Sequence, residues 1–213
     1  ISRLVFKNAS GTETYKTSLD KSDSTILQIQ LSGKSVGSMT EVVAMYTNAT
    51  GQSYAVGAFN AQLYAPETYT VVLVNTGNAS INADAVKEEL NRIYGSVFIN
   101  WEVKVADKLS LPSSIKTNIH IESSGLLSNY MPDMKPIISY FKDNSAAYNS
   151  GSTHTSYLLL GCSNDGNLSG YMPRLCNIGF IFENNPHTIA HELGHGAFGL
   201  KHIFSADELG EGY

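Results

Sequence analysis

The chain of 213 residues is long enough for one large domain or two small ones, and its 42% of hydrophobic residues is ample for a core. No apolar run approaches the ~20 residues of a membrane helix. The net charge of −5, without a basic cluster, argues against nucleic acid as a partner. Only 15% of residues are charged, and Ser, Thr, Asn, Gly and Tyr are abundant, which favours a secreted, β-rich protein whose signal peptide is not visible.

Residues 1–68 are predicted to form a small all-β, sandwich-like domain. Short strand-like segments separated by Gly, Ser, Asn and Asp turns run through this part: LVF, TILQIQL, EVVAMYT and SYAVGAF. It contains no His or Cys. A structural or recognition module is therefore preferred over a pro-segment that blocks a catalytic site.

From Tyr69 onward, strands and helices alternate. TYTVVLVN is a continuous apolar strand of the kind buried on both faces. Asn82 or Asp84 can begin a helix that runs to about Ile93, with Gly95 as its stop. VFINWEVKVAD follows as a strand, which gives a βαβ unit. MKPIISYFKDN predicts a further helix, and SYLLLGC, LSGYMP and GFIFEN predict three later strands.

The most informative segment is HTIAHELGHGAFGLKH, residues 187–202, which contains H-E-x-x-H as His191, Glu192 and His195. On a helix the two histidines lie one turn apart, so both imidazoles can bind one Zn²⁺ ion. Glu192 follows the first ligand directly, where a general base takes a proton from zinc-bound water. The motif by itself indicates metal-activated water beside a carboxylate.

His202 is the predicted third zinc ligand. On an unbroken helix it would lie about 10 Å further along the axis than His195, which ligand bonds of ~2.0–2.1 Å cannot span. The chain must therefore leave the helix, and Gly199 is the expected place because glycine adopts the left-handed conformation freely. The alternatives are a carboxylate ligand from Glu208 and a solvated histidine after the helix end.

This segment resembles the zinc motif of the metzincin clan of metallopeptidases, H-E-x-x-H-x-x-G-x-x-H. It departs from that pattern at Phe198, which stands where the family has its glycine, so one extra residue separates His195 from the final G-x-x-H of Gly199 to His202. The family also carries a methionine turn downstream of the third histidine. IFSADELGEGY, which follows His202, contains no methionine. We therefore expect a sequence cut before that turn, as part of a larger polypeptide.

The resemblance covers about Tyr69 to His202. For residues 69–213 it implies an α/β (α+β) metzincin-like catalytic subdomain, in which a twisted mixed sheet is backed by two helices and the second helix carries the zinc motif. It implies a zinc-dependent metalloendopeptidase acting on protein or peptide substrates. In the family an antiparallel strand forms the edge of the cleft. That position is held here by Leu168, Ser169, Gly170, Tyr171 and Met172, whose backbone could dock an extended peptide by strand addition.

Four questions stay open at this point. The chain could be the zinc-hydrolase toxin domain of a larger secreted protein, with one dedicated target. It could instead be a non-catalytic binding module with a vestigial zinc site, and Leu168 to Met172 could be an ordinary edge strand protected by Pro173. Cys162 and Cys176 could close a short disulfide loop or be two small buried residues.

Overall fold

The computed structural model describes residues 4–31, 35–121 and 129–202, and its contacts divide the chain into two compact units, Ile1–Ala65 and Pro66–Tyr213. This division lies just before the predicted boundary between residues 68 and 69. It comes earlier because the strand predicted from Tyr69 already begins at Glu67.

The first unit contains two antiparallel β-structures. Strands β1 (Leu4–Asn8), β4 (Met39–Thr47) and β5 (Ser53–Gln62) form a sheet in the order β1-β4-β5, and β2 (Lys16–Leu19) pairs with β3 (Leu27–Gln30). Phe6, Tyr15 and Val42 are buried between them. Strand β2 was not predicted from the sequence, because all four of its side chains are exposed and it carries no apolar pattern.

The second unit is mixed α/β and is built on a twisted mixed sheet. Its five strands are β6 (Glu67–Asn75), β7 (Ile99–Val105), β9 (Thr155–Leu160), β11 (Gly170–Tyr171) and β12 (Ile178–Ile181). They lie in the order β11-β12-β9-β6-β7; the pairs β12-β9, β9-β6 and β6-β7 are parallel, and β11 runs antiparallel to β12. The short strands β8 (Asn118–Ile119) and β10 (Ser163–Asn164) form a separate parallel pair.

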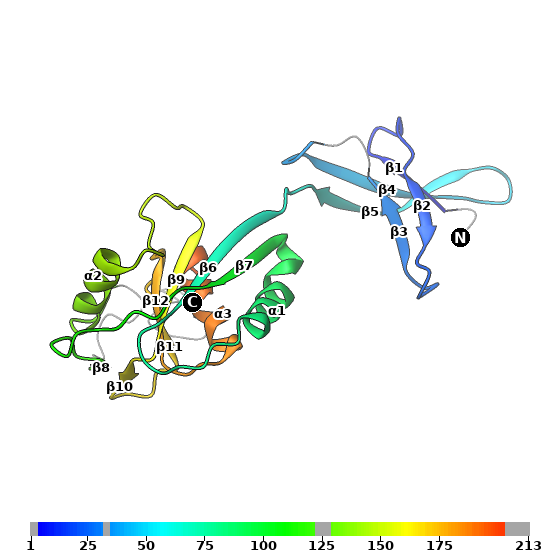
Figure 1. Cartoon of the computed structure of the whole chain (residues 1–213). Helices are drawn as coiled ribbons and strands as arrows, with labels where there is room; N and C mark the ends of the chain where they lie inside the picture. Colours follow the sequence, from blue (N-terminus) through cyan, green and yellow to red (C-terminus); the bar gives the residue numbers. More distant parts are fainter. Residues whose placement is uncertain (1–3, 32–34, 122–128, 203–213) are drawn as a thin grey trace. The chain divides into compact units, whose positions relative to one another are not determined.

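Helices cover both faces of this sheet (Figure 1). Along β6, successive side chains point to opposite faces. Val71 and Leu73 pack in a cluster with α1 (Ala83–Tyr94) and α3 (Pro186–Phe198). Val72 and Val74 pack in a second cluster with α2 (Met134–Asn144). The continuous apolar run of β6 therefore reflects burial on both faces, as predicted.

The predicted βαβ unit is present as β6, α1 and β7, with β6 and β7 adjacent and parallel. Asn82 caps α1, since its side-chain oxygen accepts a hydrogen bond from the backbone N–H of Ala85 at 3.1 Å. The α-helix ends at Gly95, as predicted, and the Gly95 N–H donates to the Asn91 carbonyl, but Gly95 does not adopt the left-handed conformation of a glycine cap. Gly95 keeps a helical φ of −61° and begins the 3₁₀ turn η1 (Gly95–Val97), and the reversal comes at Phe98 with φ 62°.

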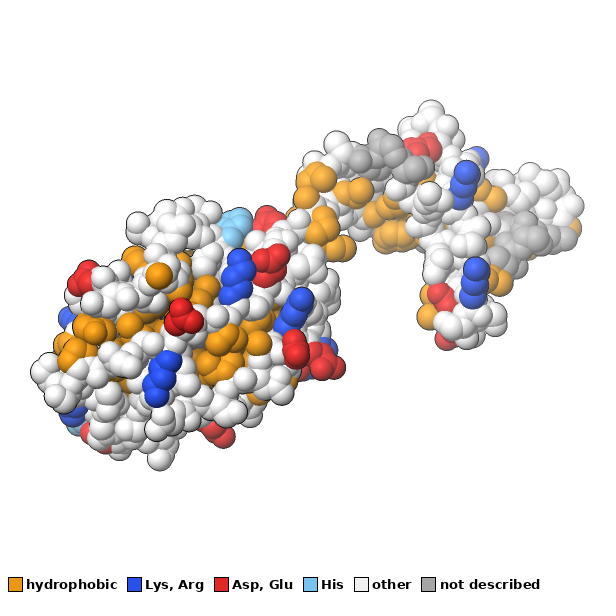
Figure 2. Space-filling view, in the orientation of Figure 1, with side chains coloured by type: hydrophobic (Ala, Val, Ile, Leu, Met, Phe, Trp, Pro, Cys, Tyr) orange, Lys and Arg blue, Asp and Glu red, His pale blue; other side chains and the backbone are white. Residues whose placement is uncertain are grey.

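Among the described residues, no helix is both long and apolar enough to cross a membrane. On the face of the second unit seen in Figure 2, acidic and basic side chains are interspersed rather than gathered by sign.

Candidate metal centre

Helix α3 has a capped N-terminus, and its apolar side chains pack in the core. The side chain of Asn185 accepts a hydrogen bond from the His187 N–H at 2.9 Å, and Pro186 occupies the first turn, where a missing N–H does no harm. Ile189 and Leu193 are fully buried in the cluster shared with α1 and the sheet. This packing leaves another face of α3 free to present polar side chains.

A buried hydrogen bond ties α3 to α1. The Tyr94 hydroxyl donates to the Ala190 carbonyl at 2.7 Å, next to the first histidine of the motif. Burial raises the pKa of Tyr94 to about 12, so the phenol keeps its proton and remains a donor. No sequence pattern indicates this contact, because it joins residues far apart in the chain.

The chain reverses at Gly199, as the spacing of the motif requires. Gly199 adopts φ 65°, in the left-handed region, and its N–H donates to the carbonyl of His195 at 2.9 Å. The N–H of Leu200 then donates to the Gly194 carbonyl at 3.1 Å, which closes the turn. The same His195 carbonyl also accepts the N–H of Leu175, at 3.2 Å.

This reversal brings three imidazoles together. The Nε2 atoms of His191 and His202 lie 3.0 Å apart, those of His195 and His191 3.1 Å, and those of His195 and His202 2.9 Å. Nitrogens at the corners of a tetrahedral zinc with bonds of ~2.0–2.1 Å would be about 3.3–3.4 Å apart, so only a few tenths of an ångström of opening is needed. The three histidines could therefore hold a metal ion.

Hydrogen bonding and burial favour the neutral imidazoles that a metal needs. Nδ1 of the buried His195 lies 2.7 Å from the Leu200 carbonyl oxygen, so Nδ1–H donates a hydrogen bond to that oxygen, and in the neutral ring Nε2 carries the lone pair. The pKa of His191 is lowered, first by burial and then by the charges of His195, His202 and His187. The His191 imidazole therefore disfavours protonation.

Glu192 lies on the adjoining face of α3, against strand β11. Its side chain is 6% exposed, and it accepts a hydrogen bond from the backbone N–H of Met172. Its Oε2 atom is buried and has no hydrogen-bond partner among the described residues. Burial raises the pKa of Glu192 to about 8 in spite of the Met172 hydrogen bond. A carboxyl group with one oxygen that lacks a hydrogen bond is suited to take up and release a proton.

Two glycines allow this close packing. A Cβ atom on Gly170 would lie 2.6 Å from Cγ of Glu192, so β11 can cross the carboxylate only with glycine there. A Cβ on Gly196 would collide with the Met172 side chain and lie 2.7 Å from the Cys176 carbonyl oxygen. The two glycines, one on β11 and one in the motif, therefore permit close approach of β11 and the segment after it to α3.

The residues predicted to bind substrate lie at the sheet edge next to Glu192. Gly170, Tyr171 and Met172 are buried, whereas Leu168 and Ser169 are partly exposed. The Met172 N–H is engaged by Glu192, and the Tyr171 hydroxyl donates to the Asn129 carbonyl at 2.6 Å. Peptide docking along this edge stays a prediction.

The remaining predicted site residues lie elsewhere. Glu208 falls outside the described residues, and the described third imidazole is that of His202. His187 helps to begin α3, and its imidazole lies 3.2 Å from a carboxylate oxygen of Glu89 on α1. Cys162 and Cys176 are free thiols.

Comparison of the chain with protein-family models, curated proteins and solved structures gave no match.

Proposed function

We propose that this protein is a secreted, zinc-dependent metalloendopeptidase. The observation that carries the proposal is the convergence of three Nε2 atoms to within 3.1 Å of one another, on the helix that also bears the buried carboxylate of Glu192. The three imidazoles match the ligand set of catalytic zinc sites, and zinc leaves a fourth position open in such sites. The secreted location rests on composition alone.

Several features of the second unit support the resemblance to metzincins. The antiparallel strand β11 lies at the sheet edge and comes between the third parallel strand and the last, and the helix after the last strand bears the motif. Phe198, the departure from the family motif, is the last residue of α3 and packs in an aromatic group with Tyr94 and Trp101. The reversal then occurs one residue later, at Gly199.

His191, His195 and His202 would hold the zinc ion, and the Leu200 carbonyl would keep His195 in the correct tautomer. When bound, zinc would supply a water of lowered pKa and polarisation of the carbonyl under attack. Glu192 would remove one proton from the attacking water as the oxygen of that water bonds to the carbonyl carbon. Glu192 then delivers that proton to the amide nitrogen as the C–N bond breaks, which leaves a carboxylic acid and an amine.

The substrate is proposed to lie as an extended strand beside β11. Gly170 would place the scissile bond near Glu192, because β11 crosses the Glu192 side chain at that residue. Affinity would then come from backbone hydrogen bonds and selectivity from side-chain contacts.

The test compares Glu192→Ala with the parent protein and with Glu88→Ala, which removes an exposed carboxylate on α1. Glu192→Ala should keep its zinc and lose hydrolysis of an unfolded protein such as casein, whereas Glu88→Ala should retain both. Equal cleavage by Glu192→Ala and the parent would contradict the mechanism. Zinc binding without cleavage by the parent would favour a non-catalytic binding module, and cleavage of one protein alone would favour a dedicated toxin.

A further inference from the structure

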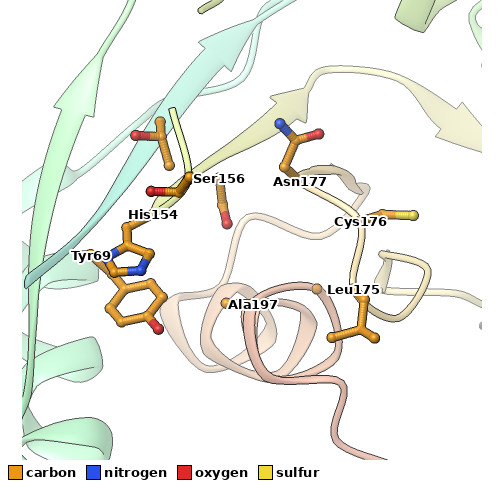
Figure 3. Close-up of a pocket in the computed structure, with 10 residues that line it drawn as sticks. Tyr69, His154, Ser156, Leu175, Cys176, Asn177 and Ala197 are labelled. Atoms are coloured by element: carbon orange, nitrogen blue, oxygen red, sulfur yellow. The ribbon is translucent and has the colours of Figure 1, made fainter. Parts of the chain in front are cut away.

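A pocket of about 150 Å³ opens at the end of α3, near the beginnings of β6 and β9. Its walls include aromatic, aliphatic and neutral polar side chains, shown in Figure 3: Tyr69, His154, Ser156, Leu175, Asn177 and Ala197. None of these six is a proposed zinc ligand, and none is the proposed catalytic residue Glu192. The pocket is therefore a separate candidate site.

The shape of the pocket fits a flat ring. On one side the Tyr69 ring stacks on the His154 imidazole, with centroids 4.5 Å apart and planes 14° from parallel. Leu175 lies on the opposite side, and Ala197 on α3 lies between the two walls (Figure 3). A cavity of ~150 Å³ is large enough to hold benzene. One six-membered ring therefore fits.

Two polar side chains in the pocket lack hydrogen-bond partners among the described residues. Ser156 is only 5% exposed, and its hydroxyl makes no hydrogen bond to any described residue. The backbone carbonyl of Asn177 accepts from the Tyr157 N–H at 2.7 Å, whereas its side-chain amide has no described partner. Both groups line the pocket and are therefore available to form hydrogen bonds with a molecule bound there.

The lining also sets the charge of that ligand. No Asp, Glu, Lys or Arg is among the described residues that line the pocket. An ionised ligand would therefore find no Asp, Glu, Lys or Arg of opposite charge among these residues. The ligand that matches all three properties is neutral, flat and able to hydrogen-bond.

We propose that this pocket binds a phenol, a neutral aromatic ring with one hydroxyl group. The ring would lie between the Tyr69–His154 stack and Leu175, and its hydroxyl would pair with Ser156 and Asn177. This chemistry is shared by the tyrosine side chain of a partner protein and by free phenolic molecules. The proposal is independent of the proteolytic function.

The test is an NMR titration of the ¹⁵N-labelled full chain with phenol, toluene and phenyl phosphate. Phenol should give saturable shifts at the amides of Ser156, Asn177 and Ala197, toluene should bind more weakly, and phenyl phosphate should not bind. Ser156→Ala should weaken phenol binding roughly 2- to 10-fold, the effect of losing one hydrogen bond, and leave toluene binding unchanged. Ser139→Ala, at an exposed serine of α2, is the matched control.

Ala197→Leu should fill the pocket and abolish binding of both rings. If that variant does not fold, Ser156→Ala and Asn177→Ala carry the test. Absence of saturable shifts in the parent up to the solubility limit of phenol would overturn the proposal, and so would equal phenol affinity in Ser156→Ala and the parent. Saturable binding of N-acetyl-tyrosinamide at the same amides would identify a tyrosine side chain as the source, and binding of phenol alone would identify a free small molecule.

Discussion

Replacing Glu192 by Gln should stabilise the metal-free protein in a pH-dependent way. The pKa of Glu192 is 4.5 in its ordinary state and about 8 in the folded protein, because the carboxylate is buried. Each unit corresponds to ~1.36 kcal/mol, so ionised Glu192 lowers the free energy of unfolding by roughly 3–5 kcal/mol at high pH. The glutamine side chain of the variant keeps an oxygen that can accept the Met172 N–H, and it carries no charge.

The sign of the effect follows from which state loses its proton first. The unfolded chain releases the Glu192 proton above pH 4.5, whereas the folded protein keeps it until about pH 8. The penalty is therefore absent below pH 4.5, grows between these values and is complete above pH 8. The stability gained by Glu192→Gln should rise from near zero at about pH 4 to its full value at about pH 9.

The assay is urea unfolding in the presence of a chelator, followed by the fluorescence of Trp101, the single tryptophan, which is buried in the second unit. Glu88→Gln is the control, because it removes an exposed carboxylate from α1 in the same unit. Curves of unfolding free energy against pH that run parallel for Glu192→Gln and the parent would refute the reasoning, since they would mean that Glu192 is ionised in the folded state at ordinary carboxylate pH.

Two glycine substitutions test the packing around the site. Gly170→Ala should push the Glu192 carboxylate out of place and reduce hydrolysis at least about 10-fold while zinc affinity is kept. Gly95→Ala, where a Cβ meets nothing within 4 Å, should be neutral in the same casein assay, and equal activity in both variants would contradict the Gly170 contact. Gly199→Ala should destabilise the left-handed turn by ~1 kcal/mol and weaken zinc binding by moving His202, as measured by competition with a chelator. Unchanged zinc affinity in Gly199→Ala would show that the turn does not position the third imidazole.

Much of the second unit could be predicted from local patterns. The apolar run of β6 predicted burial on both faces, and MKPIISYFKDN predicted α2 over the residues where it occurs. The need to bring His202 back to His195 predicted the reversal at Gly199, since no straight helix satisfies zinc geometry. These predictions succeeded because spacing along the chain determines each of them.

Features that depend on long-range packing could not be predicted in this way. Gly95 ends α1 as predicted, but no local pattern indicates that the chain continues in a 3₁₀ turn and reverses at Phe98, which is not a glycine. The crossing of Glu192 by Gly170 joins a strand edge to a helix, and neither segment alone indicates it. The pairing of Ser156 and Asn177 in one pocket likewise arises only when β9 and the loop before β12 are adjacent.

The most direct test of the metal centre is zinc K-edge X-ray absorption on the protein loaded with one equivalent of zinc. The account predicts three imidazole nitrogens at ~2.0–2.1 Å and one light, exchangeable ligand, with one imidazole lost in His202→Ala and none lost in His187→Ala. A spectrum with only two imidazoles in the parent, or one unchanged by His202→Ala, would contradict the claim that the turn at Gly199 completes the site.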